Sequence, residues 1–295
     1  MRIGLIDVDG HNFPNIALMK ISAYEKANGN DVEWWNGLKH YDKVYKAKIF
    51  DETYSEDIDY AIMADEVIKG GTGYDLQNKL PEEIEHQCPD YSLYSNFNDT
   101  AYGFLTRGCP RGCKFCVVSE KEGRESRQVA ELDEFWRGQK YIKLLDPNIT
   151  ACDDCETLFD ELIRAGSWVD FTQGVDARLI TEKQCDQLNR MKIKMLHFAW
   201  DNYEMQTYEK LKSVRNWLKY GDRKLRVYVL TNFDTTHEQD LERVYKLKEI
   251  GYDPYVMIYN KPHAPKITRQ LQRYVNNKFI FRSCDKFEEY KGGKI

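Results

Sequence analysis

Thr106-Arg-Gly-Cys109-Pro-Arg-Gly-Cys113-Lys-Phe-Cys116 is a glycine-rich stretch with three cysteines at the spacing C-x3-C-x2-C and no fourth cysteine in the same loop. Four thiolates would close a zinc tetrahedron or saturate a cubane cluster, whereas three thiolates on a 4Fe-4S cluster leave one iron free to bind another ligand. Gly108 and Gly112 allow the backbone to fold tightly around a cluster, because glycine has no Cβ to clash. The stretch therefore predicts a cluster site with one open iron at Cys109, Cys113 and Cys116.

Strand and helix patterns alternate around this stretch. The apolar run Ala101 to Leu105 precedes it, and a short helix is expected from Ser126 to Arg137. Further strands that end in polar residues are expected at 140–148, 168–178, 194–202, 225–232 and 254–260, with helices at 152–166, from Thr181, at 203–220 and at 237–251. Six strand-then-helix units over about 180 residues are too few for a full eight-stranded barrel, and they favour an open, three-quarter β/α barrel.

The cysteine motif resembles the signature of the radical S-adenosylmethionine (SAM) superfamily, which has an aromatic residue just before the last cysteine, here Phe115. The resemblance implies a partial barrel. It also implies that the open iron binds the amino and carboxylate groups of SAM. An electron from the reduced cluster then cleaves SAM to a 5′-deoxyadenosyl radical, which abstracts hydrogen from a substrate. The expected cofactors are a 4Fe-4S cluster and SAM, and the expected reductant is a small flavodoxin- or ferredoxin-type protein.

The chemistry of such barrels lies at the carboxyl ends of the strands, so polar residues at these ends are candidates for SAM binding. Asp146 and Asn148 end the second strand, where the family uses a short motif to contact the SAM amino group. An arginine offers paired donors to a carboxylate, and an aspartate accepts from a diol. The other candidates are Gln173, Asp176 and Arg178 on the third strand, His197 and Asp201 on the fourth, Thr231 and Asn232 on the fifth, and Tyr259 and Asn260 on the sixth.

The first eighty residues predict a small Rossmann-like parallel α/β domain, followed by a linker at 81–98 and the partial barrel with a C-terminal extension at 99–295. The segment Asp9-Gly10-His11-Asn12-Phe13-Pro14 is similar to the D-x-H-x-x-G motif of cobalamin-binding domains, and Gly70-Gly71 resembles their double-glycine turn. The resemblance makes His11 a candidate cobalt ligand. The short domain and the proline at the glycine position count against cobalamin binding.

Composition bounds the function further. The chain has 295 residues, a formal net charge of -5 and no apolar run long enough to span a bilayer, so we expect a cytoplasmic, oxygen-sensitive protein without general affinity for nucleic acid or membranes. Metal binding explains several of its eight cysteines better than disulfides do. The pair Cys152 and Cys155 can hold a second metal site, but we expect these thiols to pack beneath a helix start.

Alternatives from other classes remain open on the sequence alone. The three cysteines and one further ligand can hold zinc in a non-catalytic module that binds RNA through the basic stretch Lys261 to Arg282. That stretch can instead be an amphipathic helix that packs through Leu271, Tyr274 and Val275, which is the interpretation we favour. A third alternative is an electron-transfer or regulatory iron-sulfur protein. The substrate class, whether nucleotide or nucleic acid, peptide or small metabolite, is not decided by these residues.

Overall fold

The computed structural model of the chain describes residues 1–10, 13–57 and 61–290. It consists of two compact units. The first contains Met1–Gly103 and Ala130–Lys140, and the second contains Phe104–Val129 and the chain from Tyr141 onward. Among the helices of the described ranges, none has both the length and the apolar character that crossing a bilayer requires.

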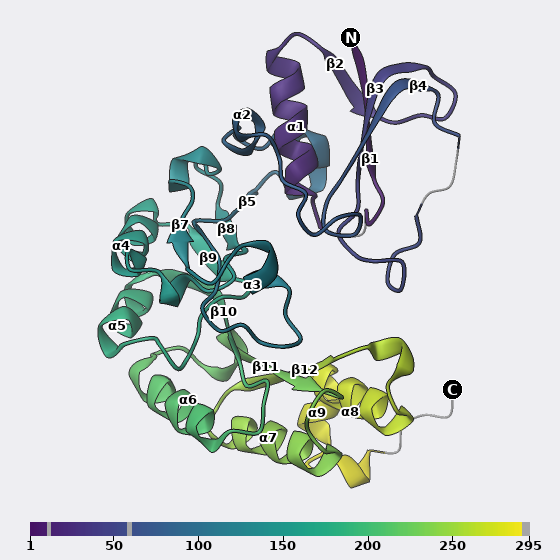
Figure 1. Cartoon of the computed structure of the whole chain (residues 1–295). Helices are drawn as coiled ribbons and strands as arrows, with labels where there is room; N and C mark the ends of the chain where they lie inside the picture. The colour runs from purple at the N-terminus through teal and green to yellow at the C-terminus, as the bar shows by residue number, and fades with distance from the viewer. Residues whose placement is uncertain (11–12, 58–60, 291–295) are drawn as a thin grey trace. The chain divides into compact units, whose positions relative to one another are not determined.

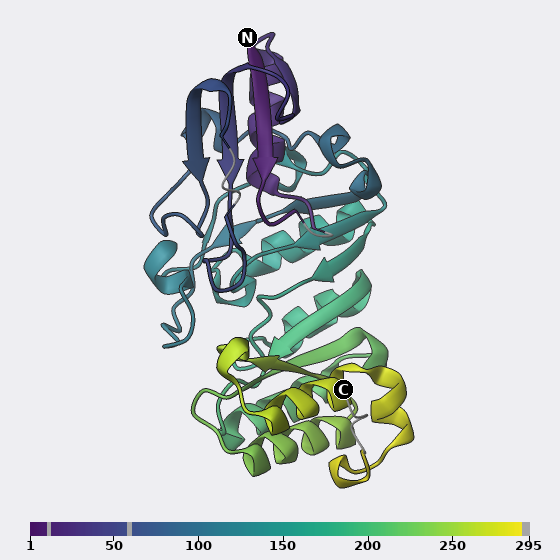
Figure 2. The same cartoon turned by 90° about the vertical axis from the view of Figure 1, so that its right-hand side faces the viewer.

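The first unit is a four-stranded parallel sheet in the order β2-β1-β3-β4 (Figures 1 and 2). Its elements are β1 (Arg2–Asp7), α1 (Ile16–Ala27), β2 (Asp31–Trp34), β3 (Tyr41–Ala47), β4 (Ala64–Gly70), α2 (Glu82–Glu85), η1 (Tyr91–Phe97), β5 (Thr100–Gly103) and η2 (Leu132–Glu134). Asn15 caps α1, because its side chain accepts a hydrogen bond from the Leu18 amide at 3.2 Å. A parallel sheet is therefore confirmed, although α1 is the only helix between consecutive strands within the described residues of this sheet.

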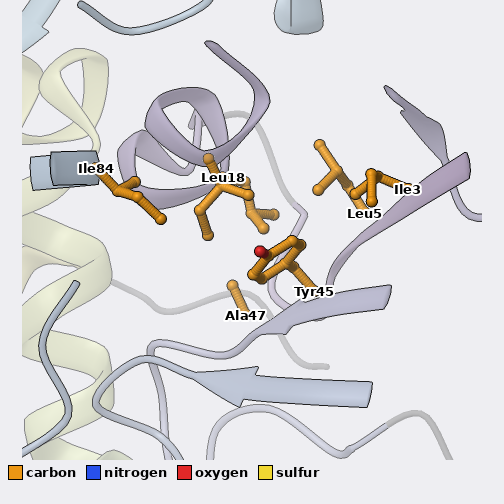
Figure 3. Close-up of a cluster of buried hydrophobic side chains, with 7 residues drawn as sticks. Ile3, Leu5, Leu18, Tyr45, Ala47 and Ile84 are labelled. Carbon is orange, nitrogen blue, oxygen red and sulfur yellow. The ribbon is translucent and has the colours of Figure 1, made fainter. Parts of the chain in front are cut away.

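The core of the first unit corrects the predicted linker. Side chains of β1 and α1 point toward one another, and Ile84 of α2 joins them (Figure 3). Leu80 and Leu93 pack against the same cluster. Residues 81–98 are thus part of the first unit instead of a free connection. The two prolines and acidic residues of this segment suggested a linker, but burial of one apolar side chain outweighs local composition.

The second unit contains five parallel strands that lie side by side in the order β12-β11-β10-β9-β8, so neighbours in the sheet are also neighbours along the chain. Figure 1 shows helices α4 to α7 following one another along one side of this sheet. The strands are β8 (Tyr141–Leu144), β9 (Trp168–Phe171), β10 (Lys192–Ala199), β11 (Leu225–Thr231) and β12 (Asp253–Ile258), and the intervening helices are α4 (Cys155–Ala165), α5 (Glu182–Arg190), α6 (Met205–Trp217) and α7 (His237–Glu249). Each of these elements was predicted, with ends that differ by a few residues.

Local sequence explains where several of these helices begin and end. Thr181 and Thr236 each form a capping box, with Gln184 and Gln239 respectively, as the threonine at the start of the first of these helices predicted. Gly166 ends α4 in the left-handed conformation at φ 66°. The predicted helix at 126–137 is wrong, because the chain there forms the short strand β7 (Arg127–Gln128) and the single turn η2.

The C-terminal stretch packs on the sheet through α8 (Lys266–Asn276) and α9 (Lys278–Ser283). Leu271, Tyr274 and Val275 are buried in one cluster with Val256 of β12, so the predicted amphipathic packing is confirmed. The remaining short elements of the unit are β6 (Thr106–Arg107), α3 (Val118–Lys121), η3 (Ile149–Ala151), η4 (Asp222–Lys224), η5 (Lys261–His263) and η6 (Phe287–Glu289).

Candidate functional site

The cysteine stretch is a closed loop of the second unit. Strand β6 at its start pairs antiparallel with β7 after its end, and the Cys109 amide donates to the carbonyl of Gly123 at 3.2 Å. Gly108 has φ 93°, and a Cβ at this position would lie 1.9 Å from the backbone oxygen of Glu125. Since no side chain fits there, a glycine is required for the chain to enter the cysteine loop.

The three thiols of the loop are not in disulfides. Cys109 and Cys113 are half-buried and Cys116 is exposed. Burial raises the pKa of Cys113, and the charges of Asp201 and of the other cysteines in the loop raise it further. A bound metal cation has the opposite effect because it favours the thiolate. Within the described residues, no three His, Cys, Asp or Glu side chains are placed to bind a single metal ion.

Asn148, at the end of β8, contacts the cysteine loop directly. Its side-chain Nδ2 donates to Sγ of Cys109 at 3.5 Å, and its Oδ1 accepts from the Thr150 hydroxyl at 2.9 Å. The Asn148 backbone oxygen accepts from Ser126 at 2.7 Å. Asn148 is buried, and two of these hydrogen bonds hold its side-chain amide while the third holds its backbone. Hydrogen bonds to ligand sulfurs are among the features that tune iron-sulfur clusters.

Asp146 faces the start of the loop. It is fully buried, and its Oδ1 accepts from both the amide and the hydroxyl of Thr106, the latter at 2.7 Å. Its other oxygen, Oδ2, is buried without a hydrogen-bond partner among the described residues. A contact of Asp146 with a ligand stays a prediction; in the structure its carboxylate is enclosed by protein and anchors β6.

Burial raises the pKa of Asp146 to about 6, so its carboxyl is easier to protonate in the folded protein than in the unfolded chain. The folded state therefore loses stability as the pH rises from the pKa of Asp146 in the unfolded chain to its higher pKa in the folded protein. The side chain of Asp146→Asn carries no charge and does not lose this stability. We therefore expect the free energy of unfolding of the variant, relative to that of the wild type, to be about 2 kcal/mol higher at pH 7 than at pH 4.5. Chemical denaturation at both pH values measures this difference.

Asp186→Asn on α5 is the matched control, because Asp186 is exposed to solvent and should contribute little to the change of stability with pH. An Asp146→Asn protein whose stability relative to the wild type is the same at both pH values would contradict the prediction.

Asp176 joins the cysteine loop to the end of β9. Its carboxylate accepts two hydrogen bonds from Arg178, at 2.8 and 3.1 Å, and one from Arg111 of the cysteine loop at 2.7 Å. Burial alone would raise the pKa of Asp176, but the hydrogen bonds and charge of Arg178, together with Arg111, hold it below its usual range. Asp176 and Arg178 were predicted to contact SAM, and this stays a prediction; the structure pairs the two side chains with each other. Gln173 is exposed, and its Nε2 donates to the Leu145 carbonyl at 3.2 Å.

Removing this carboxylate leaves two guanidinium groups without their partner. We expect Asp176→Ala to lower the free energy of unfolding by about 3 kcal/mol, because breaking a buried ion pair leaves uncompensated charge. The exposed pair of Glu156 with Lys183, at 2.6 Å, provides the control. We expect Glu156→Ala to lower the free energy of unfolding by less than about 1 kcal/mol. Equal losses in the two variants, measured by denaturant titration, would disprove a special role for Asp176.

Aromatic rings connect the cysteine loop to the ends of β11 and β12. Phe115 packs edge-to-face on Phe233 at 5.5 Å, and Phe233 packs on Tyr259 at 4.9 Å. Asn232 adopts φ 62°, and its Nδ2 donates to the Tyr259 carbonyl at 2.8 Å. Asparagine is one of the few residues that tolerate this conformation. The loop is therefore in contact with residues at the ends of β8, β9 and β11.

Two other candidates, Asp201 and His197, lie just after β10 and within it. Burial raises the pKa of Asp201 to about 6, and this carboxyl is close enough to influence Cys113 and Cys116. His197 lies within β10 and is buried. Cys152 and Cys155 are buried at the start of α4, as the packing interpretation predicted.

Sequence reasoning missed Thr106, Arg111 and Phe233 as partners of the site. Arg111 lies inside the cysteine motif, so its position was a usable signal. Thr106 begins the same stretch, but only the fold places it next to Asp146. Phe233 carries no such signal, because only the fold places it next to Phe115.

Comparisons with known proteins agree with this geometry at the level of the fold. No protein-family model matches the chain. No curated protein matches it significantly. Among solved structures, the chain is similar to the radical S-adenosylmethionine methyltransferase TsrM from Kitasatospora setae, solved with cobalamin and a [4Fe-4S] cluster bound. The TM-score is 0.62 at 11% sequence identity, over 87% of this chain and 74% of that one, so the two proteins share a fold.

Proposed function

We propose that the protein is a radical SAM enzyme in which Cys109, Cys113 and Cys116 hold a 4Fe-4S cluster and SAM binds the open iron. One observation carries the proposal. The loop with the three cysteines is held against residues at the carboxyl ends of three parallel strands, through Asn148, Asp176 and Phe233. Ligands of parallel α/β folds bind at this end of the strands.

The residues present fit the cluster. Three thiols on one loop supply a donor set that leaves one iron open. Asn148 donates a hydrogen bond to one of these sulfurs. Gly108 permits the backbone path that no other residue allows. When bound, the reduced cluster would supply the electron that cleaves SAM to a 5′-deoxyadenosyl radical.

The chain's own residues would bind and orient the cofactor. Gln173 and Asn232 are proposed to contact SAM from the ends of β9 and β11, because both side chains are at least partly exposed there. Arg178 is proposed to bind the SAM carboxylate while Asp176 fixes the direction of its guanidinium group. Phe115 would pack beside the cluster, and Asp146 would position the loop.

We extend the proposal to the architecture and the reductant. The sequential order of β8 to β12, each joined to the next through a helix, supports a three-quarter β/α barrel of radical SAM type. A small flavodoxin- or ferredoxin-type protein would reduce the cluster. The fold similarity to a radical SAM methyltransferase supports the class of enzyme, and the net reaction is not part of the proposal.

The first unit is proposed not to bind cobalamin. A Cβ at Gly71 would lie 2.3 Å from the Lys48 backbone oxygen, so packing inside the unit already explains this glycine. Asp9 of the D-x-H segment accepts a hydrogen bond from the Ile49 amide. His11, the candidate cobalt ligand, lies outside the described residues. After reconstitution with hydroxocobalamin and desalting, we expect no corrinoid absorption band, and a stoichiometric band would contradict this prediction.

Anaerobic reconstitution tests the proposed function. With iron, sulfide, reductant and SAM, chromatography should detect 5′-deoxyadenosine, and the protein should contain about four irons per chain. A colourless zinc protein without SAM cleavage would support the alternative of a zinc module that binds nucleic acid. That alternative loses Tyr274 as a ring on which a base could stack, because this side chain is buried. A cluster without 5′-deoxyadenosine would support an electron-transfer or regulatory protein.

A further inference from the structure

The sheet of the second unit carries polar residues on the face opposite α4. Val169 and Phe171 of β9 are buried, and Phe171 packs edge-to-face on Phe159 of α4 at 5.7 Å. Successive side chains of a strand point to opposite faces, so Asp170 and Thr172 lie on the other face. In Figure 1 the helices from α4 to α7 follow one side of this sheet. We call the other side the inner face.

The inner face continues across the neighbouring strands. On β10, Phe198 packs on Tyr252 at 5.8 Å, which places the adjacent His197 on the inner face. The His197 ring stacks on Tyr228 of β11 at 5.1 Å with an interplanar angle of 12°. Tyr228 in turn packs edge-to-face on Tyr255 of β12 at 5.9 Å. Four adjacent strands thus bring an acid, an imidazole and two phenol rings into one row.

The surroundings of His197 determine which ring nitrogen carries hydrogen. Its Nδ1 lies 2.7 Å from the Phe171 carbonyl oxygen, which can only accept a hydrogen bond. Nδ1 is therefore the protonated nitrogen. Burial lowers the pKa of His197, and Arg226 and Lys143 lower it further, while the Phe171 carbonyl and Asp170 act in the opposite direction. In this neutral ring, Nε2 is an acceptor, and it has no hydrogen-bond partner among the described residues.

Two further polar atoms of the inner face lack partners. Asp170 is 8% exposed, and its Oδ1 is buried without a hydrogen bond within the described part of the chain. The nearest ionisable nitrogen, Nδ1 of His197, is 3.7 Å from it and already donates to Phe171. The hydroxyl of Thr172 is buried and unpartnered in the same way. Buried polar atoms normally have a partner, so two such atoms beside an open Nε2 indicate a missing ligand.

Charge and shape restrict this ligand. Lys143 lies 3.9 Å from Asp170, and Asp253 is bound both by Arg226, at 3.0 and 3.1 Å, and by Lys278, at 2.6 Å, so each acid of the row is opposed by at least one base. The atoms that await a partner include two acceptors, Asp170 Oδ1 and His197 Nε2, and acceptors favour a group with N–H donors over a carboxylate or phosphate. The adjacent tyrosine rings favour a flat ligand.

We infer that the inner face binds a planar, nucleobase-type heterocycle of the substrate, with Asp170 Oδ1 and His197 Nε2 accepting its N–H hydrogens. The inference rests on the proposed function in one respect, since that function makes the bound group the substrate of the radical. It names the substrate class that the cysteine loop leaves open. These side chains bind and position the heterocycle.

Nitrogen NMR of the full chain tests the inference without cluster or SAM. In ¹⁵N-labelled protein, long-range spectra of the six imidazoles report which ring nitrogen is protonated, and His197→Gln identifies the signals of His197. We expect the Nδ1-protonated form. Adenosine, cytidine and guanosine each offer an amino group, and at least one should shift the Nε2 signal saturably. Benzoate, a flat ring that only accepts hydrogen bonds, should not.

Matched variants complete the test. Asp170→Asn should weaken the nucleoside response at least about tenfold, because a charged acceptor is lost. The exposed His263→Gln in the same unit should leave the response intact. An Nε2-protonated His197, no shift with any nucleoside, or a shift with benzoate alone would each overturn the inference. These outcomes are independent of 5′-deoxyadenosine formation, so failure of this site and failure of the proposed function can be told apart.

Discussion

Replacing Cys113 by alanine should abolish cluster binding and SAM cleavage together. The variant removes one of only three thiols in the loop, and no fourth cysteine lies close enough in sequence to replace it. Loss of a residue that merely supports a metal ligand already costs about 10- to 100-fold in affinity or activity, so loss of a ligand should cost at least about 100-fold. Iron content after anaerobic desalting and the rate of 5′-deoxyadenosine formation measure the two effects.

Cys284→Ala is the matched control for this prediction. Cys284 lies in the second unit at the end of α9 and is partly exposed. Its thiol is outside the cysteine loop, so we expect unchanged iron content and unchanged SAM cleavage. If Cys113→Ala retains the full iron content, or if Cys284→Ala loses it, the assignment of the three ligands is wrong.

Gly108→Ala should prevent the cysteine loop from closing. The added Cβ would lie 1.9 Å from the Glu125 backbone oxygen, and the residue would also have to adopt φ 93°. Neither backbone can move without opening the β6–β7 pair at the base of the loop. We expect the free energy of unfolding to fall by about 3 kcal/mol from strain. Iron retention should fall at least about tenfold.

Gly123 allows the clash to be separated from the backbone conformation. It lies in the same loop and has the same φ of 93°, but a Cβ there would meet no atom within 4 Å. Gly123→Ala should therefore cost only about 1 kcal/mol for the left-handed conformation. Denaturant titration and iron analysis of both variants give the comparison. Equal losses would mean that the contact with Glu125 does not matter.

Periodic patterns predicted the regular part of the second unit well. The strands β8 to β12 are each followed by polar residues and alternate with four helices, two of which, α5 and α7, begin at a threonine cap. Such signals are local, because strand alternation and capping depend on residues a few positions apart. The helix expected at 126–137 failed for the same reason. There, Arg127 and Gln128 pair with β6 at the other end of the cysteine loop, and local sequence cannot reveal a partner that far away.

The sequence identified the residues of the candidate site better than it predicted the contacts between them. Asp176 and Arg178 were both identified from the end of a strand, but their mutual pairing and the third partner Arg111 depend on where the loop folds back. Asp146 was also identified from a strand end, but its hydrogen bond with Thr106 depends on where the cysteine loop begins. A residue type at a strand end defines which hydrogen bonds are available, and packing selects which of them form.

The sequence by itself determined the donor set of the cysteine loop and the succession of strands and helices. Thiol spacing and hydrophobic periodicity are properties of neighbouring residues, so they can be read along the chain. Only the tertiary structure decided that Asn148 bonds to the sulfur of Cys109 and that Asp170, Thr172 and His197 share one face with unpartnered atoms. The contact of Asn148 with Cys109 joins residues 39 positions apart, and that of His197 with Phe171 joins residues 26 positions apart. Their energy is realised only when the fold brings these segments together.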